Sequence, residues 1–387
     1  MDKSLVKKVS ENFAQNFSGE PVLIYSPGRI NIIGEHTDYN AGFVFPAAID
    51  KGIVAAIQKV DAQKGSPKDR STATAIDMDE TIYFDTNNLN TENLSSWHAY
   101  VIGVVAETQK LGKEVGNFNI VFGGNIPDGA GMSSSAALEN SVVFGINELF
   151  ELGLTKYEMI LISQAAEHNY VGVKCGIMDQ YASMFGIENS ALLLDCRTAK
   201  AEPFAIDFGD YQLLLFNTNV KHKLSDSAYN DRRAVCEKTA ELLGIEALRD
   251  ATEEDLEKVK DQLSEEDFQK VVYVVQENNR AQAAAVAMKE GNLEELGKLI
   301  YGSHNGLQNQ YKVSCDELDF LVDLAKETPE VLGARMMGGG FGGCTINLIK
   351  KTAVADFKEK AVAAYTEKFG HACSPYEVAL SDGTHKI

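Results

Sequence analysis

The first sixty residues combine one amphipathic segment with short apolar runs. Leu5, Val9 and Phe13 recur at helical spacing, and polar residues interrupt them too often for a signal-peptide core, so a helix is predicted here. Apolar runs predict strands, and the glycine-containing segments between them predict a loop and then a turn or short helix. The strands are expected at residues 21–26, 43–50 and 52–60.

The pattern changes after residue 60. Residues 61–96 are polar and turn-rich with brief strand-like pieces, and they predict no clear element. Residues 118–124 predict a strand, 125–132 a loop, and a helix is expected to begin near Ser133. Residues 245–270 carry dense charge at helical spacing, which is typical of a solvated helical surface. Later helices are expected at 156–171, 281–304 and 315–329, and buried strands at 191–197, 211–219 and 344–349.

Composition limits the class of partner. The 387 residues are 44% hydrophobic, which favours two domains with a sizeable core. The net charge of -20 argues against nucleic acid and against anionic lipid, and no apolar run approaches membrane-spanning length. A small-molecule partner is expected, and no obligate protein partner is evident. ATP is compatible with this charge, because backbone N–H groups, a few cations and a metal ion can hold a nucleotide.

The six cysteines are scattered without a CxxC pair or a Cys/His ligand pattern. Such spacing is typical of reduced thiols, and a cytoplasmic location is therefore expected. No chemistry is assigned to any of the six.

A glycine- and serine-rich segment lies between the strand at 118–124 and the helix that follows. It consists of Gly129, Ala130, Gly131, Met132, Ser133, Ser134 and Ser135. Unpaired N–H groups at a helix N-terminus bind anions, so this segment is a candidate phosphate loop. It lacks the GK[ST] ending of a Walker A loop and does not complete GxGxxG. The alternative is an ordinary N-cap in which one serine satisfies the first helical turn.

A polar cluster interrupts the apolar strands near the N-terminus. Arg29 is followed within a dozen residues by Glu35, His36 and Asp38. Such side chains can form several hydrogen bonds to the hydroxyls of a sugar, each of which both donates and accepts. The alternative is an ordinary polar turn that Asp38 and Asn40 cap.

One carboxylate, Asp179, lies among small and apolar residues before a predicted helix. If it meets Arg29, the cation favours the ionised carboxylate, which can orient and deprotonate an attacking hydroxyl. The alternative is a helix N-cap. Two further features stay open: Glu167 is a solvated helical glutamate unless a cation lies nearby, and the glycine cluster at 338–343 either approaches a ligand or merely connects two strands.

Three segments, PGRINIIGEHTDYNAGFVFPA, IPDGAGMSSSAALE and GARMMGGGFGGCTINLI, together resemble the three signature motifs of the GHMP small-molecule kinases. The first motif is similar to the galactokinase signature, and the similarity continues through AEHNYVGVKCGIMDQYAS and SAYNDRRAVC. It therefore spans most of the chain.

The resemblance implies roles for individual residues. Asp179 would be the catalytic base or orienting carboxylate, and Arg29 would stabilise the transferring phosphoryl group. The sugar would be held by Glu35, His36, Asp38, Gly176 and Tyr229. The loop from Gly129 to Ser135 would wrap the ATP phosphates, Ser135 and Glu167 would hold Mg²⁺, and Trp97 and Tyr100 would approach the adenine.

The resemblance also implies a fold and a reaction. The fold would be α+β, with an N-terminal ribosomal-protein-S5-like domain at residues 1–199, a C-terminal ferredoxin-like domain at residues 200–387, and the active site in the cleft between them. The reaction would transfer the γ-phosphoryl of Mg·ATP to the anomeric hydroxyl of α-D-galactose. The alternatives are an N-acetylgalactosamine kinase and a non-catalytic galactose- and ATP-binding regulator.

Two departures from the family pattern concern the nucleotide. Asp128 adds a negative charge beside the candidate phosphate loop, so its side chain is expected to point away. Residues 61–96 match the family poorly, and no nucleotide contact is expected from them.

Overall fold

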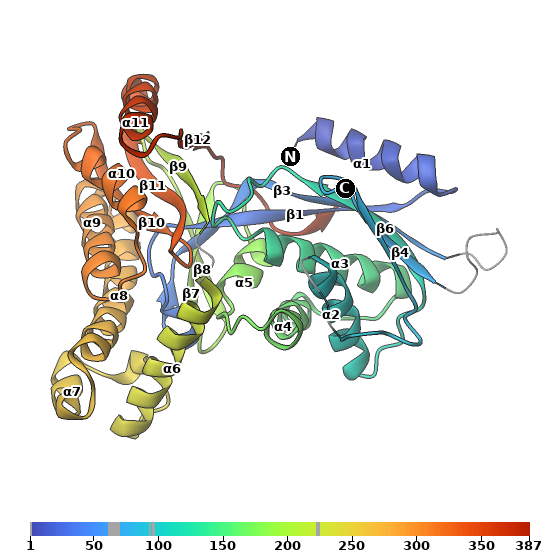
Figure 1. The fold of residues 1–387 in the computed structure, drawn as a ribbon, viewed down its shortest axis with the longest axis horizontal. Coiled ribbons are helices and arrows are strands. Elements are labelled where there is room, and N and C mark those ends of the chain that lie inside the picture. The colour runs from blue at the N-terminus through green and yellow to red at the C-terminus, as the bar shows by residue number, and fades with distance from the viewer. Residues whose placement is uncertain (1, 61–69, 93, 95–96, 222–224) are drawn as a thin grey trace.

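The computed structural model describes residues 2–60, 70–92, 94, 97–221 and 225–387. Within them the chain forms three sheets with helices packed against their faces, an α+β arrangement (Figure 1). No helix of these described residues is both long and apolar enough to cross a membrane.

The largest sheet has six strands in the order β13-β1-β3-β6-β4-β5. Its members are β1 (Val22–Asn31), β3 (Pro46–Lys59), β4 (Ser71–Ala75), β5 (Glu80–Phe84), β6 (Phe118–Gly124) and β13 (His385–Lys386). All neighbours are antiparallel except β4 and β6. Because β13 pairs with β1, the C-terminus of the chain returns to the sheet that its N-terminal part begins.

Successive side chains of a strand point to opposite faces of the sheet, and in this sheet both sets are largely apolar. Helices therefore cover both faces. Tyr25, Val54 and Val121 pack against α1 (Lys3–Asn16), whereas Ile24, Ala55 and Ile120 join the larger core on the other face. That larger core also contains α2 (Trp97–Lys110), α3 (Ser134–Phe150), α4 (Lys156–Ala166) and α5 (Met178–Phe185). Figure 1 shows α1 alone on one side and these helices on the other.

A four-stranded antiparallel sheet forms the other part of the molecule, in the order β10-β11-β9-β12. Its strands are β9 (Tyr211–Lys221), β10 (Val331–Met337), β11 (Gly342–Lys350) and β12 (Ser374–Glu377). Helices separate β9 from β10 and β11 from β12, which is the split βαβ arrangement of ferredoxin-like folds. The expected ferredoxin-like part is therefore confirmed.

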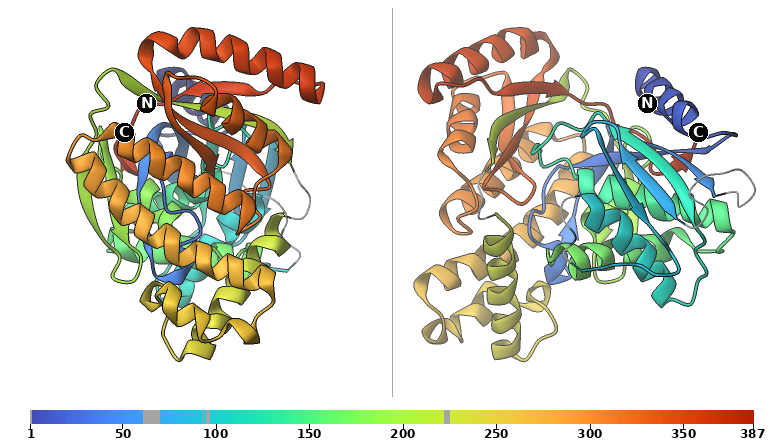
Figure 2. Two further views of the ribbon diagram at one scale, coloured as in Figure 1. Left: turned by 90° about the vertical axis from the view of Figure 1, so that its left-hand side faces the viewer. Right: turned by 45° about the vertical axis from the view of Figure 1, so that its right-hand side comes forward.

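The helices of this part are gathered at the end of the molecule that lies away from α1 (Figure 2). They are α6 (Ser225–Leu243), α7 (Glu253–Glu257), α8 (Glu265–Lys289), α9 (Leu293–Asn309), α10 (Asp316–Lys326) and α11 (Val354–Phe369). One face of the sheet packs on α10 and α11, through residues such as Phe216 and Phe357. The other face presents Leu215 and Ile346 to a core shared with Ile30 and Phe45 of the N-terminal segments. This shared core joins the two large sheets.

A small sheet, β2-β7-β8, consists of β2 (Phe43–Val44), β7 (Ser190–Asp195) and β8 (Lys200–Ala205). Short helical turns complete the structure at Asp38–Asn40, Glu167–Val171, Leu248–Asp250, Lys260–Gln262 and Lys351–Ala353. The turn at Glu167–Val171 is a π-helix that continues α4.

Most predicted elements are present, with two corrections in the N-terminal region. The loop predicted at residues 27–29 is wrong: β1 continues to Asn31, and a register shift between Pro27 and Arg29 accommodates the proline. The runs at 43–50 and 52–60 were expected to form two separate strands. Instead β3 continues through the half-buried Asp50 and Lys51 and includes most of both runs. The charged surface at 245–270 is confirmed as helical but is broken into short pieces.

The contact between α9 and β10 yields a test of packing. A side chain at Gly297 would overlap the backbone of Leu332, whereas one at Gly302 of the same helix would meet only Arg280 Cδ at 3.6 Å. Gly297→Ala should therefore lower the free energy of unfolding by about 1–3 kcal/mol. Gly302→Ala should raise it by up to about 1 kcal/mol through helix propensity. Thermal and denaturant unfolding of both variants would measure this, and a shift of equal sign in both would contradict the packing argument.

Candidate active site

The pair expected to carry the chemistry, Arg29 and Asp179, is in direct contact. Arg29 Nε donates to Asp179 Oδ1 at 2.8 Å and Nη2 donates to Oδ2 at 2.8 Å, so the ion pair is bidentate. Ser133 Oγ also donates to Oδ2, and Arg29 Nη1 donates to the carbonyl of Gly131. Burial opposes the charge of Arg29, but the carboxylates of Asp179 and Glu35 outweigh it and raise the arginine pKa. The arginine therefore stays charged at the centre of the site.

Residues from β1, from helices and from the loops after β1 and β10 line one pocket around this pair, with a cavity volume of about 180 Å³. The pocket includes all but one of the residues expected to hold a sugar: Glu35, His36, Asp38 and Tyr229. Tyr229 comes from α6, whereas the other three come from the segment after β1. The pocket is completed by Glu167, Cys175, Gly338 and Gly339.

His36 is held as a neutral imidazole in this pocket. Burial and the nearby charge of Arg232 lower its pKa to about 3. One ring nitrogen, Nδ1, lies 2.9 Å from the Tyr39 hydroxyl, and Nε2 is buried with no hydrogen-bond partner among the described residues. His36 also has a positive φ of 66°, a conformation that costs energy and clusters at functional sites. An unpaired polar atom in a strained residue is what a hydroxyl-binding group requires before its ligand arrives.

Asp38 titrates near neutrality, because burial and the charge of Asp179 raise its pKa to about 7. Gly176, the remaining expected sugar-binding residue, lies directly against it: a side chain at position 176 would overlap the Asp38 carboxyl group. Helix α6 holds the loop before Gly176, since Asn230 accepts from the Lys174 N–H at 3.0 Å and Arg233 donates to the Lys174 carbonyl at 2.9 Å. Gly176 therefore positions Asp38 in addition to any sugar contact of its own.

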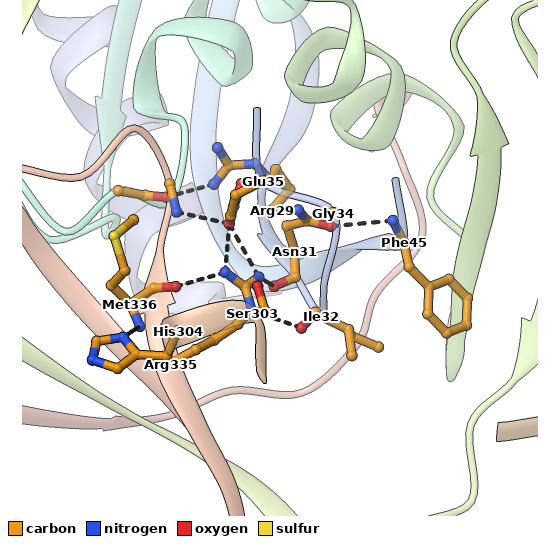
Figure 3. Close-up of polar contacts among 12 residues, drawn as sticks. Arg29, Asn31, Ile32, Gly34, Glu35, Phe45, Ser303, His304, Arg335 and Met336 are labelled. Carbon is orange, nitrogen blue, oxygen red and sulfur yellow. Dashed lines mark hydrogen bonds and ion pairs between the residues drawn. The ribbon is translucent and has the colours of Figure 1, made fainter. Parts of the chain in front are cut away.

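Glu35 is fixed by a buried arginine from β10, as Figure 3 shows. Arg335 is 0% exposed, and both of its terminal nitrogens donate to Glu35 Oε1 at 3.1 Å. The N–H of Gly338 donates to the same oxygen at 2.8 Å. The glycine cluster at 338–343 thus turns the chain from β10 into β11, and Gly338 and Gly339 line the pocket. Its approach to a ligand stays a prediction.

The candidate phosphate loop lies against that cluster and against Arg29. A side chain at Gly131 would come within 3.1 Å of the Met337 carbonyl, and the Met132 carbonyl accepts from the Arg29 N–H at 3.0 Å. Helix α3 begins at Ser134, which confirms a helix start near Ser133, and Ser133 itself has a left-handed φ of 59°. The Ser133 side chain makes no N-cap hydrogen bond and instead contacts Asp179, so the simple N-cap alternative fails for this residue. The first N–H groups of α3 are therefore free of a Ser133 side-chain cap.

The expected metal ligands, Ser135 and Glu167, are in hydrogen-bond contact. Glu167 begins the π-helix, is buried, and has its pKa raised to about 7 by burial and by Asp179. Gln180 Nε2 donates to Glu167 Oε2 at 3.0 Å and reaches Glu139 Oε2 at 3.4 Å. The solvated-glutamate alternative for Glu167 is therefore wrong.

These donors fit Mg²⁺, which binds through one or two protein oxygens plus phosphate and water. A hydroxyl and a raised-pKa carboxylate supply two such oxygens, and a cation would relieve the crowding of Glu167 beside Asp179. No cluster of three or more His, Cys, Asp or Glu suited to a metal occurs among the described residues.

Trp97 lies away from the residues that line the pocket. It is 3% exposed in the core under the six-stranded sheet, and its indole N–H donates to Glu80 Oε2 at 2.8 Å. Tyr100, on the same helix, packs against the edge of that core. The adenine contact of both residues stays a prediction. Asp128 is exposed, and its carbonyl accepts from Asn217 Nδ2 at 3.4 Å.

Three family models match the chain. They are the galactokinase galactose-binding signature over residues 11–59, the GHMP kinase N-terminal domain over residues 99–187 and the GHMP kinase C-terminal model over residues 284–367. Galactokinase of Thermotoga petrophila is 41% identical over 364 residues, which cover 94% of this chain and 99% of that protein. Galactokinase of Clostridium beijerinckii is 40% identical and covers 94% of each chain.

The chain belongs to the galactokinase family of GHMP kinases. The members of this family are ATP-dependent sugar kinases, and the chain is an enzyme of that type. Lactococcus lactis galactokinase, whose crystal structure is a complex with galactose, superposes with a TM-score of 0.91 at 34% identity, covering 99% of this chain and 100% of that one. Methanococcus jannaschii mevalonate kinase, at 17% identity and a TM-score of 0.66, covers 95% and 100% and shares the GHMP fold.

Sequence reasoning missed several buried polar residues of the galactokinase-family site. Arg335 lies within the motif GARMMGGGFGG, and Gln180 directly follows Asp179. Glu277 of α8 accepts from the Gly34 N–H at 3.0 Å. The signal in the sequence that could have identified them was a single polar or charged residue within an apolar strand or helix, because a buried polar or charged group requires a partner. The sequence could not identify that partner, since each pair joins distant segments.

Gly176→Ala tests the contact with Asp38. The added methyl group should displace the Asp38 carboxyl group and weaken sugar binding about tenfold or more, with the affinity for ATP unchanged. Calorimetric binding of galactose and ATP would measure both effects. In an Asp38→Ala background the same substitution should cost little, and an equal loss in both backgrounds would show that Gly176 acts independently of Asp38.

The raised pKa of Asp38 predicts a pH dependence of sugar binding. The carboxylate form accepts hydroxyl hydrogens, and it is lost as the pH falls through about 7. The dissociation constant for galactose, measured without metal or nucleotide, should therefore rise about tenfold between about pH 8 and about pH 6. Asp38→Asn should bind weakly at all pH values. The same pH slope in that variant would assign the titration to another group.

Proposed function

We propose that the chain is a galactokinase that transfers the γ-phosphoryl group of Mg·ATP to the anomeric hydroxyl of α-D-galactose. The observation that carries this proposal is the bidentate Arg29–Asp179 pair, which lies between the pocket of Glu35, His36 and Asp38 and the loop that precedes α3. A hydroxyl bound in that pocket and a phosphate bound at that loop would meet at this pair.

The proposed chemistry requires alignment and charge neutralisation more than covalent work. Asp179 orients the anomeric hydroxyl and accepts its proton, and the Ser133 hydroxyl and Arg29 hold the carboxylate in place. The Arg29 guanidinium and the N-terminal N–H groups of α3 stabilise the negative charge of the transferring phosphoryl group. Ser135 and Glu167 would hold Mg²⁺, which supplies further neutralisation of the ATP phosphates when bound.

Two more assignments belong to this proposal. A division into residues 1–199 and 200–387 is supported by the positions of the two GHMP models, which lie on either side of residue 200. A reducing, cytoplasmic compartment is supported by six free cysteines.

The non-catalytic regulator has little support, because the chain keeps the serines of the loop, and Arg29, Asp179 and Ser133 are in direct contact. N-acetylgalactosamine remains an outcome of the test, because it would use the same polar array with additional space at the C2 substituent.

The test is ADP release with Mg·ATP and a panel of galactose, N-acetylgalactosamine, glucose, mannose and mevalonate. Galactose-dependent turnover is expected, and chelation of Mg²⁺ should abolish it. Asp179→Asn should keep the binding of galactose and ATP but lower kcat by about 10²–10⁴-fold, the range of general-base catalysis.

Asp250→Asn is the matched control, since Asp250 forms a bidentate pair with Arg197 outside the pocket and its loss should leave turnover unchanged. Near-wild-type turnover of Asp179→Asn would refute its assignment as the base. Turnover with N-acetylgalactosamine alone would change the substrate, and sugar binding without turnover would favour the regulator.

A further inference from the structure

Arg335 is the largest side chain among those buried completely in the described residues, and all but one of its hydrogen bonds go to the end of β1 and the turn that follows it. Its Nε donates to the Ile32 carbonyl at 2.9 Å, and Nη2 donates to the Asn31 carbonyl. Nη1 donates to the carbonyl of Met336 at 2.6 Å. Both terminal nitrogens also donate to Glu35. A residue of β10 thus holds the turn that carries the sugar motif (Figure 3).

The two carboxylate oxygens of Glu35 are used differently. Arg335 Nη1, Arg335 Nη2 and the Gly338 N–H all donate to Oε1. In the described part of the chain no hydrogen bond ends on Oε2, and Glu35 lines the pocket while its side chain is only 2% exposed. A carboxylate held by one oxygen presents the other in a fixed direction. Oε2 is therefore the oxygen available to a ligand.

The backbone of the turn does not depend on this ion pair alone. Glu277 binds the Gly34 N–H at 3.0 Å, and the Tyr273 hydroxyl donates to the Glu35 carbonyl at 3.0 Å. The Asn31 and Ile32 carbonyls, at the start of the turn, accept from Arg335 irrespective of the Glu35 side chain. Other contacts therefore hold the backbone of the turn. The bonds from Arg335 to Oε1 additionally fix the direction of the Glu35 side chain.

We propose that Arg335 is a positioning residue for sugar recognition: it fixes Glu35 through Oε1 so that Oε2 accepts one hydroxyl of the hexose. This inference rests on the proposed function, because it takes the pocket as the sugar site. Since Gly338 shares Oε1 and lies beside Gly131, the same contact aligns the sugar-binding turn with the phosphate loop. Arg335 touches neither substrate and acts only through Glu35.

The primary test is galactose binding to Arg335→Lys, which keeps the charge but removes the two-nitrogen fork. The dissociation constant for galactose, measured by calorimetry without nucleotide, should rise about tenfold or more. The dissociation constant for ATP should change less than about twofold. Arg335→Met should show a larger loss of galactose affinity. If the methionine variant does not fold, the result with Arg335→Lys alone decides the test.

Deoxygalactoses separate positioning from a general structural effect. Glu35→Gln, measured with the 2-, 3-, 4- and 6-deoxy sugars, identifies the hydroxyl that Glu35 binds. The penalty of Arg335→Lys should disappear for the sugar that lacks this hydroxyl and persist for the others. A penalty that is the same for all four sugars would overturn the proposal, because it would show that the pocket as a whole is disturbed.

Arg249→Met is the matched control. Arg249 also ties distant segments, through the Asp195 carboxylate and the Ala41 carbonyl, but it contacts no carboxylate of the pocket. Its loss should lower the unfolding temperature and leave the galactose dissociation constant unchanged. If the wild type neither binds nor phosphorylates galactose, the proposed function fails. If the wild type binds galactose and Arg335→Lys binds it within about twofold, only the positioning role fails.

Discussion

The bidentate pair of Arg29 and Asp179 is the interaction on which the arrangement of the site depends. Arg29 is almost fully buried in β1, where an unpaired charge would be very costly, and Asp179 opens α5, 150 residues later. The remaining nitrogen of Arg29 and its backbone N–H bind the loop before α3. One buried cation therefore requires β1, α5 and the phosphate loop to meet at one place. The position of the Asp179 carboxylate follows from satisfying this arginine.

Around this pair the protein concentrates buried carboxyl groups, whose negative charge must be balanced by bound protons or by a ligand. Asp38 and Glu167 are both buried close enough to Asp179 that its charge raises their pKa values. Deeper still, burial and Glu167 raise the pKa of Glu139 well above its usual range, and Glu139 Oε1 has no partner among the described residues. A carboxylate cluster of this kind is unfavourable for an empty protein but favourable for one that takes up a cation and hydroxyl donors. The net charge of -20 argued against broad polyanion contacts, and the structure shows where part of that charge is used.

The sequence predicted the helices and strands better than it predicted where they end and which residues meet between them. The helix start near Ser133, the strand at 118–124 and the later helices follow from periodicity, because each depends on residues close in sequence. The continuation of β1 through Pro27 and Gly28 was not predictable, since it depends on a register shift against β3. The candidate sugar and phosphate motifs were identifiable as a set, because three segments in this order resemble the signature motifs of the GHMP kinases. The partners that hold them, Arg335 for Glu35 and Gln180 for Glu167, were not, because the pairing of buried polar groups is decided by tertiary contact.

The two buried arginines show how a site between two sheets can be built from one chain. Arg29 comes from the six-stranded sheet and holds the loop before α3, whereas Arg335 comes from the four-stranded sheet and reaches back to the turn after β1. The Arg29 guanidinium binds the Gly131 carbonyl and one carboxylate, and Arg335 binds two carbonyls at the turn and one carboxylate. Each therefore fixes a backbone position and a side-chain direction together. If either sheet moved relative to the other, Arg335 would lose its carbonyl partners while still buried, a cost that opposes such movement. The same contacts that stabilise the junction of the sheets therefore preorganise the pocket for its ligand.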